Sequence, residues 1–201
     1  MKKRILGIVS TITLLTGAFT IYNNESNTNE DYKVVQVHGD FAMDITNKEE
    51  LVGNSENVFV AKVLEEIGTV SADPNLPNTQ YKVSVEENIK GKLNGEQIVN
   101  HFGGFKTEEG ESILIKFENQ ELLQPGETYI FSTIKDDNNN WHNSVPGYGE
   151  VPLAGYGESS LASKQLQSSL VQEFYEAFEN QKISTIMERQ DLELVNGLVE
   201  E

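Results

Sequence analysis

The sequence contains no cysteine among its 201 residues. A disulfide, a catalytic thiolate, a cysteine-based zinc site and lipid attachment at a signal-peptide cysteine are therefore excluded. Cations are also scarce, since 15 lysines and arginines face 32 aspartates and glutamates and leave a formal net charge of −17. This shortage disfavours nucleic-acid partners, because binding to phosphates depends on clustered Lys and Arg.

The amino terminus carries a long uncharged run. Three basic residues at positions 2–4 precede residues 5–22, which contain no charge. This pattern predicts a signal peptide over residues 1–18, with small residues before a cleavage point after Ala18. The alternative is an uncleaved membrane anchor, since the run is close to the lower limit of about 17 residues for a spanning helix. We expect a secreted or extracellular, cell-surface-associated protein, which contacts the membrane only if the segment stays uncleaved.

Residues 19–31 are expected to form a flexible linker, because positions 23–30 hold no apolar side chain. The next segment, 32–39, has the composition of a strand, either at a sheet edge or in an arm. Thr46 or Asn47 is predicted to cap a short helix that ends at Gly53.

Apolar and polar residues then alternate with a period of two, which is typical of strands. In "NVFVAKV" both faces are apolar, whereas Tyr81, Val83 and Val85 alternate with polar residues before a turn at Gly91–Gly95 and a second alternating run, 97–102. Two prolines predict a loop over residues 71–78. Further strands at 112–117 and 128–135 complete a mainly β domain over residues 32–158, predicted to be a small OB-like antiparallel β-barrel.

The period changes after a stretch rich in glycine and proline at residues 146–157. Leu166, Leu170, Phe174 and Phe178 recur at helical spacing, which predicts an amphipathic helix over residues 160–181 that packs on the barrel. Residues 159–201 are thus expected to form a carboxy-terminal helix and an acidic tail. The pattern does not decide the structure of the tail after Lys182.

Three segments of this predicted barrel resemble a known family. The segments "ENVFVAKVLEE", "YKVSVEENIKGKLNGEQIVNHFGG" and "LQPGETYIFST" are similar to the netrin-like, or tissue-inhibitor-of-metalloproteinases, OB-fold barrels. The resemblance covers core and turn positions over roughly 75 residues, so it implies the fold more than an activity. As the resemblance implies, related barrels of this kind also occur in secreted proteins of Gram-positive bacteria whose roles are unassigned. The inhibitors chelate the protease zinc through an amino-terminal cysteine, which this chain lacks, so that mechanism is excluded.

An aromatic segment provides the candidate binding residues. The tetrapeptide Gly-Tyr-Gly-Glu occurs twice and contains Tyr148 and Tyr156, and the single tryptophan, Trp141, lies just upstream. These three side chains are the candidate binding residues, because exposed aromatic rings can form a stacking surface for a glycan or a peptide. The alternative is a loop that packs its tyrosines on the barrel.

No metal or cofactor is expected. His38, His101 and His142 lie in separate segments without the spacing of a zinc site, and the polar tip 135–140 lacks the alternating spacing of a calcium loop. The sequence also holds no recognised nucleophile motif, so we predict no catalytic residues.

These observations predict a secreted, non-catalytic binding module of a Gram-positive-type bacterium. Its partner is expected to be a protein, peptide or glycan at the cell surface. Two alternatives remain open: a secreted hydrolase with an unrecognised carboxylate site, and a structural cell-envelope protein.

Overall fold

The computed structural model describes residues 19–22, 32–39, 41, 44–73, 76–118, 120–153 and 161–183. The predicted signal peptide, Tyr156 and the tail after residue 183 lie outside these ranges. The strands are β1 Phe19–Tyr22, β2 Lys33–Gly39, β3 Asn57–Asp73, β4 Leu76–Lys90, β5 Glu96–Glu108, β6 Glu111–Phe117, β7 Thr128–Asp136, β8 Trp141–Ser144 and β9 Glu150–Pro152. The helices are α1 Lys48–Gly53 and α2 Leu161–Glu179.

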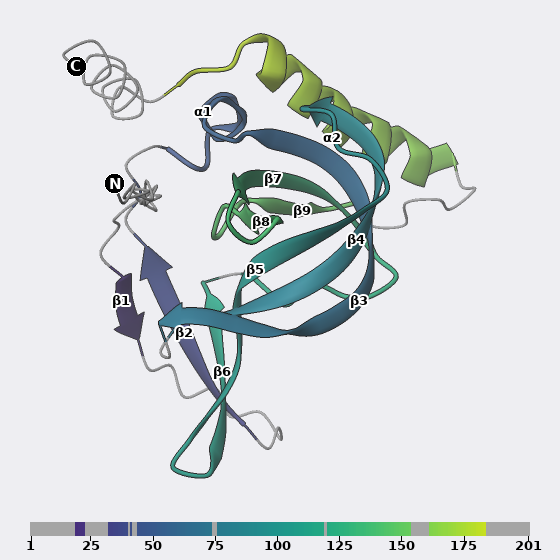
Figure 1. The fold of residues 1–201 in the computed structure, drawn as a ribbon. Coiled ribbons are helices and arrows are strands. Elements are labelled where there is room, and N and C mark those ends of the chain that lie inside the picture. Colours follow the sequence, from purple (N-terminus) through teal and green to yellow (C-terminus); the bar gives the residue numbers. More distant parts are fainter. Residues whose placement is uncertain are drawn as a thin grey trace, which may run out of the picture.

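Five strands close into a barrel in the cyclic order β3, β4, β5, β8, β7 and back to β3. Four of these pairings are antiparallel, and the closing pair β5–β8 is parallel. The prediction of a mainly β, OB-like barrel with a packed carboxy-terminal helix is confirmed, apart from this parallel pair and a second one between β2 and β6. The β5–β6 hairpin and β2 extend from one end of the barrel (Figure 1).

The departure of β5 from the barrel depends on Gly103. Residues from Glu96 to Gly103 pair with β4, and Gly103 to Glu108 pair with β6, so Gly103 belongs to both ladders. Gly103 has a φ of 111°, and a Cβ atom there would lie 2.7 Å from the Ile115 carbonyl oxygen. Only glycine fits this conformation and this close approach, so the residue lets β5 turn away from the barrel and continue along β6.

Two segments that the sequence predicted to be a loop or a linker contain strand residues. The loop predicted at 71–78 is wrong, because β3 continues to Asp73 and β4 begins at Leu76. Pro77 lies where the β3–β4 register shifts between Val70 and Asp73, so its missing N–H removes no paired bond. Within the expected linker, Phe19–Tyr22 form β1, which pairs with the free edge of β2.

The alternation along β3 separates two cores. Phe59, Ala61 and Val63 point into the barrel, where they pack with residues of β4, β5 and β7. Val58 and Val60 point outward into a second core beneath the helices. Both faces of this strand are thus buried, as the sequence predicted, although Lys62 is exposed.

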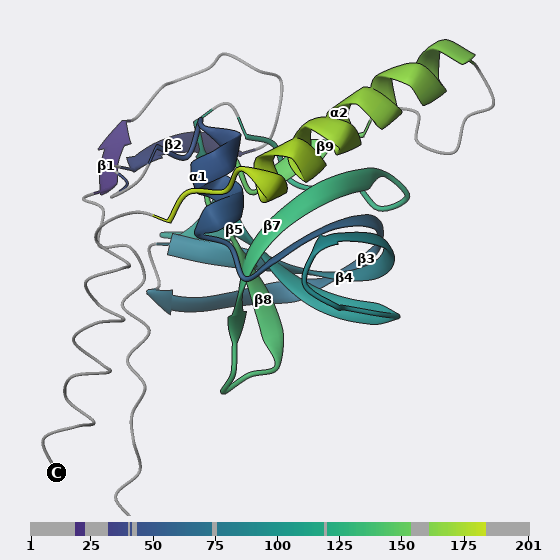
Figure 2. The ribbon, with the colours of Figure 1, turned by 90° about the horizontal axis from the view of Figure 1, so that it is seen from above.

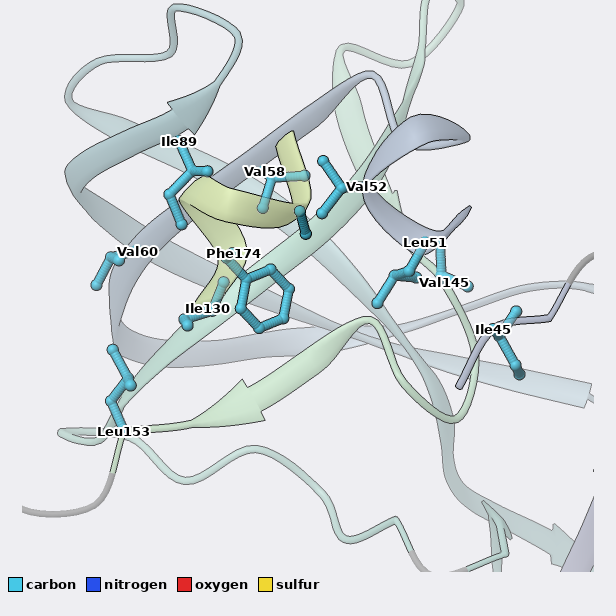
Figure 3. Packing of buried hydrophobic residues seen from close by; sticks show 11 residues of the cluster. Ile45, Leu51, Val52, Val58, Val60, Ile89, Ile130, Val145, Leu153 and Phe174 are labelled. Carbon is cyan, nitrogen blue, oxygen red and sulfur yellow. The ribbon is translucent and has the colours of Figure 1, made fainter. Parts of the chain in front are cut away.

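Helix α2 covers the outer side of the barrel, as its helical pattern predicted. It lies beside α1 when the molecule is seen from above (Figure 2), and it also contacts β4. Its Phe174 is 1% exposed, and its ring projects among Val52, Val58 and Ile130 (Figure 3). The helices of the described residues are too short or too polar to cross a bilayer.

The short helix α1 begins as the sequence predicted. The Asn47 side chain accepts hydrogen bonds from the N–H groups of Glu49 and Glu50, at 2.9 and 3.4 Å, and so caps the first turn. At the other end, a Cβ atom on Gly53 would lie 2.0 Å from the Lys182 carbonyl oxygen. The segment after α2 therefore packs directly on α1.

Candidate functional site

A row of side-chain amides crosses the outer face of the barrel. Gln80 on β4 donates to Asn100 on β5 at 2.8 Å, and Asn100 donates to Asn143 on β8 at 2.7 Å. Their neighbours Tyr81, Val99 and His142 point into the barrel, so the amides face outward because side chains alternate along a strand. The row spans three strands, or about 10 Å at the usual strand spacing.

Trp141 lies on the same face as this row. It precedes Asn143 by two residues, and the pairing of Val99 with His142 places Ile98 beside it. The Trp141 Nε1 donates to the Asp136 carboxylate at 3.2 Å, which holds the half-buried indole in one orientation. We call Gln80, Ile98, Asn100, Trp141 and Asn143 together the amide face.

The Asp136 carboxylate that holds the indole is itself fixed by the hairpin turn after β7. It accepts bonds from the backbone N–H groups of Asn138 and Asn139, at 2.9 and 3.2 Å, and from the Asn139 side chain at 3.0 Å. These bonds, that of the Asn139 side chain above all, lower the pKa of Asp136 from its usual value. The polar tip predicted from the sequence at residues 135–140 thus holds the Trp141 ring in place through Asp136.

Of the predicted aromatic residues, the structure places Trp141 and Tyr148 apart. Tyr148 is 45% exposed on the turn before β9, and Tyr156 lies outside the described residues. Trp141 pairs with Asp136, and Glu150 pairs with Phe131. The first residues of β8 and β9 are therefore about 16 Å apart along β7. Trp141 and Tyr148 therefore belong to different parts of the surface.

A buried network of polar side chains links β5 to β9. The His101 Nδ1 lies 3.1 Å from a Glu150 carboxylate oxygen, with 0% and 2% of these side chains exposed. The other Glu150 oxygen accepts a bond from Gln120, whose own oxygen accepts from the Gly147 N–H at 3.0 Å. Side-chain bonds thus join β5, β9 and the turn between β8 and β9, next to the short β5–β8 ladder.

Several buried polar atoms near this network have no hydrogen-bond partner within the described part of the chain. They are the Tyr81 hydroxyl, His101 Nε2, His142 Nδ1 and the hydroxyls of Ser132 and Ser144. Burial raises the pKa of Tyr81, so its hydroxyl keeps its proton. The described residues contain no group of three acidic, histidine or cysteine side chains that could hold a metal ion. At 0–2% exposure, the His101–Glu150 pair is closed off from solvent.

The three histidines occupy unlike sites. His38 Nδ1 lies 2.6 Å from Glu118 at the half-exposed surface of β2. His101 and His142 lie in neighbouring strands of the barrel wall, although 41 positions separate them in the sequence. No spacing signal in the sequence predicts this closeness, because it follows from the parallel β5–β8 pairing.

His142 should make stability depend on pH. It is 3% exposed, and burial lowers its pKa below the usual 6.5, with Lys135 lowering it further and Glu56 raising it. As the pH falls below about 6.5, the unfolded chain binds the proton first, so the free energy of unfolding should decrease. Urea denaturation between about pH 7.5 and pH 5.5 measures this decrease. The His142→Gln variant should show a smaller decrease than the wild type, and an equal decrease would contradict the assignment to His142.

A shallow groove of about 470 Å³ lies between α1 and α2. Its lysines are paired, with Lys48 at 2.6 Å from Glu173 and Lys182 at 2.5 Å from Glu49. Such exposed ion pairs contribute little free energy and leave few charges for a ligand. The amide face is therefore the stronger candidate site.

No family model matches the chain, and no curated protein matches it significantly.

Proposed function

We propose that this protein is a secreted, non-catalytic binding module of a Gram-positive-type bacterium, and that it binds a cell-surface ligand on the amide face. One observation carries the proposal: Trp141 and three connected side-chain amides lie together on the outer side of β4, β5 and β8. An amphipathic ring beside a few fixed polar groups is the usual composition of a ligand site. The outer side of the second and third barrel strands is also the side on which OB-folds bind their ligands, which supports the proposal by analogy.

The alternatives find less support in the described residues. The buried carboxylate of Glu150 is sealed against His101 and Gln120, so a substrate cannot reach it without opening the barrel. A purely structural envelope protein gives no reason for a tryptophan held at the surface by Asp136. The binding function accounts for this side chain directly.

Removal of the indole tests the proposal. The Trp141→Ala variant should bind cell-surface material of the producing bacterium at least about tenfold less than the wild type, which is about 1.4 kcal/mol of binding free energy. The measurement is retention of the labelled protein on washed cells. Phe105→Ala is the matched control, because Phe105 is 45% exposed on the distant part of β5 that pairs with β6. Equal retention of Trp141→Ala and wild type would contradict the function.

A further inference from the structure

We infer that the ligand of the amide face is a neutral, hydroxyl-rich carbohydrate. This inference rests on the proposed function and specifies the chemical class of its ligand. Three features of the face carry it. The amides leave some of their hydrogen-bonding groups free, the strands beneath them have neighbours on both sides, and the charged side chains at the border are already engaged within the protein.

The amides keep both donors and acceptors for a ligand. Among the described residues, Gln80 and Asn143 use their side chains only to bond Asn100. Gln80 therefore retains its Oε1 acceptor and one N–H, and Asn143 retains two N–H donors. A sugar hydroxyl both donates and accepts, so adjacent hydroxyls of one ring match this mixed set. Asn100, which is only 5% exposed, holds the side chains of Gln80 and Asn143 in place through these two hydrogen bonds.

The indole supplies the other half of the site. A sugar ring has an apolar C–H face as well as its hydroxyl edge, and an amphipathic ring such as that of Trp141 can cover the apolar face. The hydrogen bond to Asp136 holds the Trp141 ring in place before a ligand arrives, which reduces the entropy lost on binding. The row of about 10 Å is long enough for more than one sugar ring.

The backbone beneath the amide face does not offer a strand edge to a peptide. In the described barrel, β4 lies between β3 and β5, and β8 lies between β5 and β7. An extended peptide is usually bound through the main-chain groups of an exposed edge strand. On this face only side chains remain for recognition, which favours a carbohydrate over a peptide.

The charged groups at the border of the amide face are already engaged within the protein. Lys82, next to Gln80 on the same face of β4, lies 2.5 Å from Glu65, and Asp136 is engaged by Trp141 and its own turn. The whole chain carries a net charge of −17. An anionic polysaccharide would meet no free cation on the amide face, so the ligand is expected to be neutral.

Soluble oligosaccharides test the ligand class. The probes are the tetramers of β-1,4-linked N-acetylglucosamine, of cellulose and of amylose, with heparin and a peptide of alternating Val and Lys as comparisons. Trp141 is the only tryptophan, so its fluorescence reports binding at the amide face itself. At least one neutral oligosaccharide should shift this fluorescence, whereas heparin and the peptide should not.

The Asn143→Asp variant separates recognition from folding. It keeps the oxygen that accepts from Asn100 and removes the two N–H donors offered to the ligand. Its oligosaccharide affinity should fall about tenfold with an unchanged melting temperature, while Ser84→Ala, farther along the outer face of β4, should bind as the wild type. Equal affinity of Asn143→Asp and wild type would overturn the inference.

The failures of the two proposals are distinguishable. A fluorescence shift with only the peptide or heparin, or with none of the probes, overturns the carbohydrate class. If Trp141→Ala still loses retention on cells, the binding function stands with another ligand. If Trp141→Ala is retained like the wild type, the binding function itself is wrong.

Discussion

The Val83→Asp variant should fail to fold. Val83 is 0% exposed and points from β4 into the apolar interior of the barrel, where it packs in the same core as Phe59, Val99 and Phe131. A carboxylate there has no cation to pair with, and burying an unpaired charge costs several kcal/mol or more, against a total stability of about 5–15 kcal/mol. Far-ultraviolet circular dichroism and urea denaturation of the purified variant measure the loss.

The neighbouring position provides the control. Ser84 points to the opposite side of β4 and is half-buried, opposite Lys62 on one side and Glu96 on the other. Attraction to the lysine and repulsion from the glutamate offset each other, so Ser84→Asp should change the free energy of unfolding by only about 0.5 kcal/mol. Equal destabilisation by the two aspartates would show that β4 does not have one buried face.

The Phe174→Ala variant should lose about 3–5 kcal/mol of stability. The ring lies at 1% exposure between α2 and the outer side of the barrel, where it packs in a core with Val58 and Ile130 (Figure 3). Truncation removes the buried apolar surface and leaves a cavity that the two layers cannot fully close. Lys48 also places its ammonium 5.9 Å from the ring centre, a contact that the alanine would lose. Urea denaturation gives the difference in free energy of unfolding.

Gln172→Ala is the matched substitution on the exposed side of the same helix. It removes no buried contact, so its stability should stay within about 0.5 kcal/mol of the wild type. A loss below about 1 kcal/mol for Phe174→Ala would mean that α2 does not contribute to the stability of the barrel.

Local periodicity was sufficient to predict most of the fold. The two-sided apolar pattern around Val58–Val63 and the one-sided pattern at Tyr81 and Val83 identified the strands, because side chains alternate along a strand regardless of its partners. Helix α2 was predicted from its helical spacing in the same way. The loop predicted at 71–78 is wrong because a proline does not have to end a strand: Pro77 lies at a shift in register that requires no N–H from it.

The candidate site was only partly predictable. The sequence pointed to Trp141 through residue type alone, and it grouped this residue with Tyr148, from which the course of β8 and β9 along β7 separates it. The amide row joins residues 80, 100 and 143, and the buried pair joins residues 101 and 150. These contacts depend on the registers of β4 with β5, of β5 with β8 and of β7 with β9, which no local pattern encodes.

The sequence by itself therefore determined most of the secondary structure, the β-rich class and the inward side of each main strand, since these follow from the spacing of apolar residues along the chain. The tertiary structure alone decided which polar side chains meet across the strands. Asn100 and Asn143 carry no signal of their own in the sequence, and they contact each other only because the barrel closes with β5 parallel to β8. Barrel closure is a property of all five strands together, and it places the amide face and the buried His101–Glu150 pair on opposite sides of the same wall.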